Sequence, residues 1–324
     1  MKNAVKNEKP LVGIVIVNWN QCDYTIDCLN SLEGLKYKNW KAYVVDNASS
    51  DDSVNRLMKL TEKAEFIQSE VNKGWAGGNN IGITKAINDG CEFILLLNND
   101  ACVYEDTIDK LLEAKKNCTQ EYGIFGCVIE SYDLSGEIQF CGSFVNKKTG
   151  APRSLSVEKF NEYEKYKYYE SASAIGCAIF TESSTFNSVG LIDERYFLNY
   201  DETDWCFRAN KVGIKTAIVP SARVRHKGSV SIGGARSPVN IYFMARNRLY
   251  FAQRHSSFYQ RIYLIKQTIW DYDSLSKKEQ GFGWILSLFI ANSYKVKAFR
   301  RGIYDFIIGR SGNCPEYIVK NNKK

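Results

Sequence analysis

Hydrophobic and polar positions alternate in blocks through the first 120 residues. Short apolar runs at 11–18, 41–45, 65–68 and 93–97 are separated by stretches whose apolar residues recur every three or four positions. The runs predict buried strands, and the spaced stretches predict helices that begin near Asp23, near Ser50 or Asp51, after the glycine-rich segment 72–80, and near Glu105. Because strand and helix alternate with short polar connections, the pattern predicts a parallel sheet covered by helices, an α/β fold.

The pattern changes after residue 121. Strands are predicted at 122–131, 138–144 and 215–219, the last closed by Pro220, and residues 171–180 read as a strand or a packed turn. Helices are predicted at 201–212 and 239–253, and residues 256–310 read as aromatic-rich helices with basic faces. The charged, tyrosine-rich stretch 145–170 reads as a mobile loop, and 223–231 as a basic loop.

Composition narrows the class of protein. The chain has 324 residues, 44% hydrophobic and 24% charged, which is typical of a soluble globular protein with a sizeable core. Its net charge of +7 favours anionic partners such as nucleotides, acidic lipids or nucleic acid. No signal peptide or membrane-spanning segment is recognised, and the longest apolar patch lies at 284–291. The ten cysteines form no CxxC pair, so we expect reduced, mostly buried thiols in a cytoplasmic protein and no zinc site.

Polar residues follow each of the four predicted strands of the first half. Asn18, Asp46, the glycine-rich segment 72–80 and Asn98-Asn99-Asp100 occupy these positions. The carboxyl ends of parallel strands meet at one edge of a sheet, where such sheets bind nucleotides. Asp46 is suited to accept from a pyrimidine N3–H, the glycines allow close approach of backbone to ligand, and Asp100 is suited to hold a cation that binds a diphosphate. Turn chemistry explains each position alone, but the joint pattern favours a nucleotide site. G-x-G-x-x-G and P-loop motifs are absent.

Two further clusters of residues are candidates for catalysis or metal binding. Asp201, Glu202 and Asp204 stand at a predicted helix start, where an acidic first turn is common but where a carboxylate also suits a general base. His226 lies in the basic stretch 223–231, which is either a solvated loop or a phosphate-facing segment whose histidine ligates a cation.

These motifs together resemble the family 2 glycosyltransferases, nucleotide-sugar-dependent enzymes of the GT-A fold. The similarity extends over about residues 11–255 and is greatest to a bacterial branch that contains rhamnosyltransferases of cell-surface polysaccharide assembly. The segments that carry it are 15–20, 44–49, the N-x-G-x-A-x-G-x-N loop 72–79, 97–100 in place of D-x-D, the acidic motif 201–204, and the late histidine His226.

The resemblance implies a Rossmann-like, mostly parallel sheet covered by helices in a catalytic domain, 1–255. Residues 11–120 would form its nucleotide-sugar-binding half, 121–255 its acceptor-binding half, and 256–324 a C-terminal amphipathic helical extension. It assigns Mg²⁺ or Mn²⁺ to Asp100 and His226. The residues it assigns to the donor are Val17, Asn18, Asp46, Lys73, Gly74, Gly77, Asn79, Asn98 and Asn99.

Two positions depart from the family pattern. Asn98 replaces the first Asp of D-x-D, so metal contact is expected to rest on Asp100. The acidic motif reads Asp-Glu where many relatives have Glu-Asp, and the second carboxylate, the family's usual base, maps to Glu202. Asp201 is then expected to contact the acceptor hydroxyl, and Asp204 is the alternative base or a supporting residue.

The implied function is metal-dependent, inverting transfer of a sugar to a hydroxyl of a growing surface glycan, such as O-antigen or capsule, or of a lipid-linked acceptor. The branch favours dTDP-rhamnose as donor, with a UDP-hexose possible. The alternative is a catalytically silent nucleotide-sugar-binding protein. A nucleotidyltransferase is disfavoured because no Gly-rich basic loop follows the first strand, and nucleic-acid binding is disfavoured because the aromatics lie in predicted core and C-terminal helices. The C-terminal helices are expected to dock on an anionic membrane, at its inner face, or equally to pack on the catalytic domain or on a second subunit.

Overall fold

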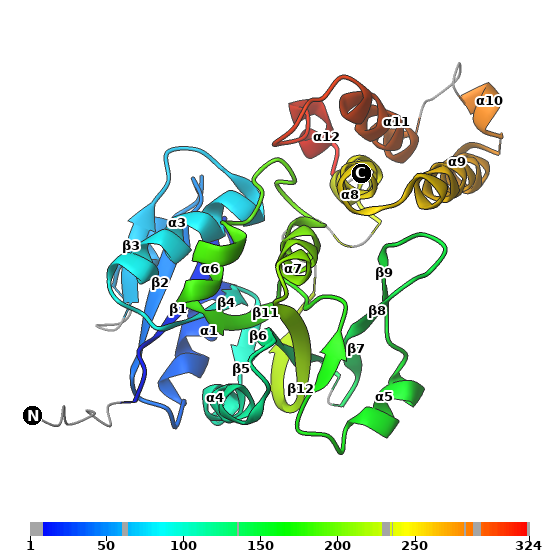
Figure 1. Cartoon of the computed structure of the whole chain (residues 1–324). Helices are drawn as coiled ribbons and strands as arrows, with labels where there is room; N and C mark the ends of the chain where they lie inside the picture. Colours follow the sequence, from blue (N-terminus) through cyan, green and yellow to red (C-terminus); the bar gives the residue numbers. More distant parts are fainter. Residues whose placement is uncertain are drawn as a thin grey trace, which may run out of the picture.

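A ten-stranded sheet forms the centre of the molecule (Figure 1). The computed structural model describes residues 9–59, 64–134, 136–228, 234, 236–281, 283–287 and 293–322. The strand order is β10-β12-β6-β11-β4-β1-β2-β3, with β5 paired to β12 and β7 to β6, and a separate pair is formed by β8 and β9. Two layers of helices cover the sheet, and a third group of helices packs beside it.

The first half of the sheet is parallel, as the sequence predicts. Its strands are β1 (Val12–Asn18), β2 (Trp40–Asp46), β3 (Ala64–Gln68) and β4 (Phe93–Asn98). The helices between and after them are α1 (Cys22–Glu33), α2 (Ser53–Leu57), α3 (Gly74–Asn88) and α4 (Thr107–Asn117). In the register of the sheet, Asn18 lies beside Asp46, and Val17 lies beside Asn98. The polar residues that end these strands are therefore neighbours at one edge.

Period-two alternation along β1 divides the core into two parts. Ile14 and Ile16 face one side of the sheet, where they join side chains of α1 and α4. Val15 faces the other side, where α3 packs. Gly82 of α3 approaches so closely that an added Cβ would lie 2.4 Å from Val15. The glycines of α3 thus bring the helix close to the sheet.

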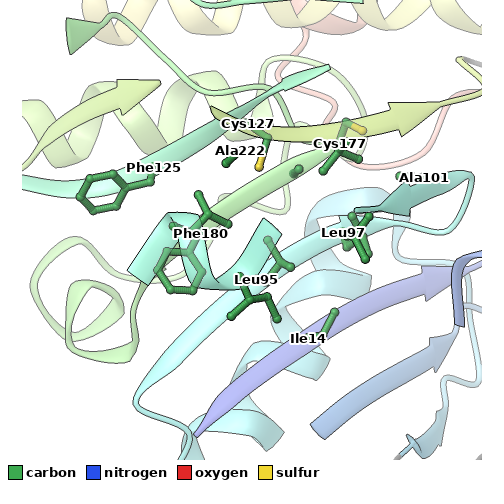
Figure 2. Packing of buried hydrophobic residues seen from close by; sticks show 14 of the residues in the cluster. Ile14, Leu95, Leu97, Ala101, Phe125, Cys127, Cys177, Phe180 and Ala222 are labelled. Atoms are coloured by element: carbon green, nitrogen blue, oxygen red, sulfur yellow. The ribbon is translucent and has the colours of Figure 1, made fainter. Parts of the chain in front are cut away.

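The second half of the sheet is mixed. Its strands are β5 (Ala101–Val103), β6 (Tyr122–Ser131), β7 (Ile138–Phe140), β8 (Ser143–Val145), β9 (Pro152–Ser154), β10 (Tyr169–Ser171), β11 (Ala178–Glu182) and β12 (Lys215–His226), with α5 (Val157–Tyr163), α6 (Ser183–Val189) and α7 (Asp201–Lys211) among them. β11 runs antiparallel between β4 and β6 and joins the two halves. Figure 2 shows the packing at this junction, where Leu95 of β4 pairs with Phe180 of β11 and both side chains are fully buried.

Several local predictions are wrong. The stretch read as a mobile loop, 145–170, contains β9, α5 and the start of β10. Pro220 does not close a strand, because β12 continues through it to His226 with a shift of register between Val219 and Arg223, and a proline is tolerated at such an irregularity. Residues 223–226 of the predicted basic loop are therefore strand, and its last residues, 229–231, lie outside the described residues.

The ends of two helices also differ from the predictions. Asp23 lies inside α1 and pairs with Arg56 at 2.6 Å, while Gln21, in a left-handed conformation, occupies the N-cap position. Asp51 accepts a hydrogen bond from the N–H of Ser53, the first residue of α2. The N-cap position itself is occupied by Asp52. The helix ends at Leu57, with Met58 at its C-cap.

The last part of the chain forms a helical layer. It comprises α8 (Pro238–His255), α9 (Phe258–Gln280), α10 (Trp284–Ser287), α11 (Tyr294–Ile307) and α12 (Glu316–Lys320), which lie together on one side of the molecule in Figure 1. α8 lies at the end of the predicted domain 1–255, and it packs against α9, α11 and α12. The apolar patch 284–291 is described only to Ser287. Within the described residues, none of the helices combines the length and the hydropathy needed to cross a bilayer.

Candidate active site

A cavity of about 370 Å³ opens at the carboxyl edge of the parallel strands. Pockets of this volume are typical of small-molecule sites. Of the residues assigned from the sequence, the cavity brings together Val17, Gly74, Asn98, Asn99, Asp100, Asp201, Glu202 and His226. It does not include Asn18, Asp46, Lys73, Gly77, Asn79 or Asp204.

Asn18 and Asp46 do not line the cavity, and their side chains are hydrogen-bonded to each other and to Thr25 and Ser49. The amide of Asn18 donates to Asp46 Oδ1 at 3.0 Å, and Asn18 Oδ1 accepts from the Thr25 hydroxyl at 2.6 Å. Asp46 Oδ2 accepts from the N–H of Ser49 at 3.0 Å. Both side chains are buried, so in this arrangement they fix the ends of β1 and β2 relative to each other.

The neighbouring residue Asn47, which the sequence did not single out, lines the cavity and shapes its floor. Its amide donates to Gly74 O at 3.0 Å and to Asn72 Oδ1 at 3.1 Å, while its oxygen accepts from the N–H of Lys73 at 2.9 Å. The side chain of Lys73 points to solvent. Asn47 therefore holds the segment 72–74 against the end of β2.

The glycine-rich segment forms the start of α3 rather than a loop. Gly74 has φ +70°, and an added Cβ would lie 2.2 Å from the carbonyl oxygen of Phe197, so only glycine fits there. Gly77 packs against Lys73, and the Asn79 amide donates to Trp75 O at 2.8 Å inside the helix. Close packing, more than approach to a ligand, explains why these positions carry glycine.

Two tryptophans also line the cavity, and the sequence assigned neither. Trp19 and Trp75 both line it. The indole N–H of Trp75 donates to Asn98 Oδ1 at 2.8 Å, which fixes the amide that replaces the first Asp of D-x-D. Asn99 is buried, and its amide donates to the Thr25 hydroxyl at 3.1 Å.

Asp100 and His226 meet at the junction of β4, β5 and β12. Ala101 of β5 pairs with His226 of β12, and Lys227 N donates to Asp100 O at 3.0 Å, so the two side chains are brought together by backbone pairing. His226 Nε2 lies 3.1 Å from Asp100 Oδ1, yet this buried nitrogen makes no hydrogen bond. The pair presents one imidazole nitrogen and one carboxylate to a common point.

The other ring nitrogen of His226 is fixed by Gln139 of β7. The Gln139 amide nitrogen donates to the carbonyl oxygen of His226 at 3.0 Å, which leaves Gln139 Oε1 to face Nδ1, also at 3.0 Å. Because Oε1 can only accept, Nδ1 is the donor in this contact, and Nε2 is the ring nitrogen that faces Asp100. A partner that orients the second ring nitrogen in this way is typical of metal-binding histidines.

The thiols that line the cavity are neutral. Burial, together with the nearby Asp100 carboxylate, raises the pKa of Cys177 well above its usual value. Burial raises the pKa of Cys314 to about 11. All ten cysteines are free and nine are buried, as the sequence predicts.

The three acidic residues at the start of α7 have different environments. Asp201 is buried, with Oδ1 accepting from the N–H of Glu202 at 3.1 Å and Oδ2 without a partner, and burial followed by the charge of Glu202 raises its pKa well above the usual value. Glu202 is partly exposed at the cavity. A buried carboxyl group with a raised pKa is suited to donate a hydrogen bond, and here it lies beside a second, more exposed carboxyl group.

Asp204 points away from the cavity into a cluster of donors. Its carboxylate accepts from His255 Nε2 at 2.7 Å, from Arg208 Nε at 2.8 Å and from the hydroxyl of Tyr196 at 3.2 Å, with Arg254 Nη1 3.3 Å away. Burial alone would raise the pKa of Asp204, but the hydrogen bonds from His255 and Arg208 outweigh it and hold the pKa below the usual value. Asp204 thus ties α7 to α8.

The helical layer contributes a wall of the cavity that the sequence did not predict. Its members are Val239, Phe243, Asn313, Cys314, Val319 and Asn322. Phe243 stacks on Phe197 with ring centroids 5.4 Å apart. No sequence periodicity connects these positions with the strand ends, so only the packing of α8 and α12 against Phe197 and Leu198 reveals them.

Comparisons with known proteins show which sequences this chain resembles. Residues 13–167 match the family model described as "Glycosyl transferase family 2". The chain is 30% identical over 241 residues to the dTDP-rhamnosyl transferase RfbF of Shigella flexneri, covering 72% of this chain and 77% of that protein. It is 24% identical over 262 residues to the low-salt glycan biosynthesis hexosyltransferase Agl10 of Haloferax volcanii, covering 79% and 80%.

A solved structure resembles the whole fold. The mannosyltransferase PcManGT from Pyrobaculum calidifontis, in complex with GDP-Man and Mn²⁺, superimposes with a TM-score of 0.59 at 12% identity, covering 94% of this chain and 89% of that one. At this identity the likeness shows the fold alone, which is the GT-A fold that the sequence predicted.

Proposed function

The chain belongs to glycosyltransferase family 2, and we propose on that premise that it transfers a sugar from a nucleotide-diphospho-sugar to an acceptor hydroxyl with inversion at the anomeric carbon. One observation carries the proposal. A single cavity is lined by an Asp100–His226 pair suited to the diphosphate end of a donor and by Glu202 suited to deprotonate an acceptor.

Glu202 is the proposed base. As the acceptor oxygen attacks the anomeric carbon, its proton passes to the Glu202 carboxylate, and the bond to the diphosphate breaks with its electron pair on the departing oxygen. Asp201 is less suited because burial keeps it protonated, and it is instead placed to donate to the acceptor or to Glu202. Asp204 is less suited because its oxygens are occupied by His255, Arg208 and Tyr196.

Asp100 and His226 are the proposed ligands of Mg²⁺ or Mn²⁺. The residues present fit such an ion, because His226 Nε2 is buried without a hydrogen bond beside the Asp100 carboxylate, while Gln139 holds the other ring nitrogen. A bound divalent cation would supply positive charge to offset the negative charge of a diphosphate. Among the described residues no group of three or more His, Cys, Asp and Glu side chains gathers as a metal site, so these two residues leave the other ligand positions to the donor and to water.

The donor contacts that we propose centre on Val17, Trp19, Asn47, Gly74 and Asn98, which line the cavity at the strand ends. Asn18 and Asp46 are proposed to support this wall from behind. The similarity to RfbF favours dTDP-rhamnose over a UDP-hexose.

The decisive experiment measures release of the nucleoside diphosphate from UDP-, dTDP- and GDP-sugars, with and without Mn²⁺, by the full chain and by Glu202→Gln. We expect metal-dependent release from one donor class, greatest with dTDP-rhamnose, and loss of release in the variant while donor binding persists. Donor binding without any release or transfer would instead support a catalytically silent nucleotide-sugar-binding protein.

We further propose that the acceptor is a saccharide of a surface glycan, carried on a lipid at the cytoplasmic face of a membrane, and that the helical layer docks there. Residues 256–324 contain twelve Lys and Arg against five Asp and Glu, a surplus equal to the net charge of +7 of the whole chain. Each of the five acidic side chains is already paired with a Lys or Arg. The surplus positive charge thus favours an anionic surface.

The outward face of α9 supports the same proposal. Leu264, Thr268 and Tyr272 are buried beneath the helix, whereas the opposite face exposes large apolar side chains, with Trp270 68% exposed. Tyr259, Tyr263 and Trp270 lie opposite the buried stripe, and the flanks of the helix also expose Phe258, Ile262, Ile265 and Ile269. Aromatic and aliphatic side chains beside lysines are typical of helices that lie in a membrane interface.

Sedimentation of the full chain with vesicles tests the docking proposal. We expect binding to phosphatidylglycerol-containing vesicles, weaker binding to phosphatidylcholine alone, and loss of binding in Trp270→Glu but not in Phe144→Glu, which changes an exposed aromatic residue of β8. Equal binding of all forms would refute it, and a concentration-dependent dimer lost in Trp270→Glu would assign the face to a second subunit.

A further inference from the structure

The catalytic helix α7 is preceded by a backbone turn that needs external support. Phe197, Asn199 and Tyr200 all have positive φ, at 65°, 64° and 67°, and none of them is glycine. L-residues adopt this left-handed conformation at a cost, so three of them within four positions persist only where surrounding structure holds them. Asp201 and Glu202 follow directly, so the turn sets where α7 begins.

The side chain of Asn247 in α8 holds this turn. It is fully buried, and its amide nitrogen lies within hydrogen-bond distance of three carbonyl oxygens of the turn, those of Tyr196 at 2.9 Å, Leu198 at 2.7 Å and Asn199 at 2.9 Å. The turn lacks the regular partners that a helix or strand gives to its carbonyl groups. The amide of Asn247 supplies them.

Arg246 completes the support from the next position. It is also fully buried, donating from Nη2 to Tyr196 O at 2.8 Å and from Nε to Asn247 Oδ1 at 2.9 Å. The Asn247 oxygen is therefore occupied, and the amide is oriented with its nitrogen toward the turn. Arg246 Nη1 also donates to Gly312 O at 2.6 Å, which fixes the segment that enters the cavity wall.

The turn contacts the donor side as well as α7. The carbonyl oxygen of Phe197 accepts from the N–H of Trp75 at 2.7 Å and occupies the space beside Gly74. The indole of Trp75 in turn donates to Asn98 Oδ1 at 2.8 Å. One backbone segment therefore joins the start of α3, the end of β4 and the residue that we assign as base.

We propose that Asn247, oriented by Arg246, is a positioning residue that holds the 196–200 turn and thereby sets Glu202 relative to the donor side of the cavity. This inference rests on the proposed transfer reaction. Asn247 does not touch the substrate, since it lies outside the cavity lining and acts through backbone carbonyls. Displacement of reacting groups by about 1 Å is enough to lower a rate by about 10²-fold.

The test compares Asn247→Ala and the milder Asn247→Ser with Thr268→Ala. Thr268 is a similarly buried polar residue of the helical layer, and its hydroxyl donates to Leu264 O of its own helix at 2.8 Å. Its substitution controls for a general loss of stability, because Thr268 does not contact the turn. For the Asn247 variants we expect kcat to fall about 10²-fold while the donor Kd, measured with the nucleoside diphosphate, changes less than threefold. For Thr268→Ala we expect an unchanged kcat in the folded fraction.

Hydrogen–deuterium exchange of the full chain gives a readout that does not depend on turnover. We expect faster exchange in both 73–76 and 197–204 in the Asn247 variants, and in neither segment in Thr268→Ala. An unchanged kcat with exchange equal to that of Thr268→Ala would overturn the positioning role. Absence of transfer by the wild type itself would refute the proposed function instead, and the exchange pattern would then decide the positioning role alone.

Discussion

The two sides of the cavity are built in different ways. The donor side is formed by consecutive parallel strands that end side by side, and its polar residues are placed by local strand register, as with Asn18 beside Asp46. The base side is formed by a left-handed turn, one helix and a layer of helices from the end of the chain. The first arrangement needs only a regular sheet, whereas the second needs contacts between residues far apart in sequence. Catalytic placement on the base side is therefore the more easily disturbed by single substitutions.

The largest effect is expected from Glu202→Gln. Because the base acts only when the acceptor loses its proton, kcat should fall about 10²- to 10⁴-fold while donor affinity on the other side of the cavity is retained. Steady-state transfer and donor titration measure the two quantities. Glu182→Gln, at the far end of β11, is the matched control and should keep full turnover. Full transfer by Glu202→Gln would contradict the assignment.

Asp204→Asn should cost about 3–5 kcal/mol in the free energy of unfolding at pH 7, since a buried charge network loses its carboxylate. The folded pKa of Asp204 lies below the unfolded value of about 3.9, so its stabilisation is fully present above that pH and declines as the pH falls through the folded pKa. Denaturant titrations at pH 7, 5 and 3.5 should show the gap between wild type and variant narrowing toward acid. A gap that widens on acidification would contradict the lowered pKa.

Gln139→Leu probes the donor side through a residue that does not contact substrate. Without an acceptor for Nδ1–H, His226 is free to change tautomer and orientation, and we expect Mn²⁺ affinity to fall about 10- to 100-fold. Titration calorimetry of Mn²⁺ with the nucleoside diphosphate present measures this. Gln120→Leu, an exposed residue between α4 and β6, is the control. Unchanged affinity in Gln139→Leu would contradict the orienting role of Gln139.

Asp201→Asn has the smallest expected effect, and it should raise the free energy of unfolding, whereas Asp204→Asn lowers it. Its folded pKa is raised, so the stability that Asp201 contributes is present below the unfolded pKa of about 3.9 and is lost as the pH rises through the folded pKa. Asparagine keeps an acceptor for the N–H of Glu202 and does not ionise. The variant should therefore exceed wild type by about 0.5–2 kcal/mol at pH 8 and match it near pH 4, with reduced transfer. Thermal unfolding at the two pH values decides between this result and a simple loss of stability.

The same contrast between local and long-range structure explains how much the sequence could predict. Strand ends, the fold class and the group Asn98, Asp100, Glu202 and His226 follow from local patterns and family motifs. Asn18 and Asp46 were predicted to lie at the ends of β1 and β2. Their hydrogen bonds to each other and to Ser49 depend on the register of the two strands, which no single run of sequence contains. The predicted strand end at Pro220 was wrong because proline is usually excluded from the interior of a strand. The shifted register of β12 accommodates it here.

The residues missed by sequence reasoning act across long separations. Gln139 reaches His226 from 87 positions away, and Asn247 reaches Leu198 from 49. Neither has a periodic or motif signal, since a single amide in a strand or helix reads as an ordinary polar residue. The stretch 145–170 shows the opposite failure, because its charge and tyrosine content suggested a mobile loop where Phe160 and Tyr169 are buried in the main core.

The contact between Gly74 and the carbonyl of Phe197 has a consequence for recombining members of this family. A chimaera that takes residues 1–120 from one parent and the remainder from another would join a helix start and a turn that were shaped separately. If the first parent carries any side chain at position 74, its Cβ meets the turn of the second at 2.2 Å. Exchange of donor specificity by grafting the first half should therefore succeed only between parents that share this glycine, or when the 196–200 turn travels with the graft.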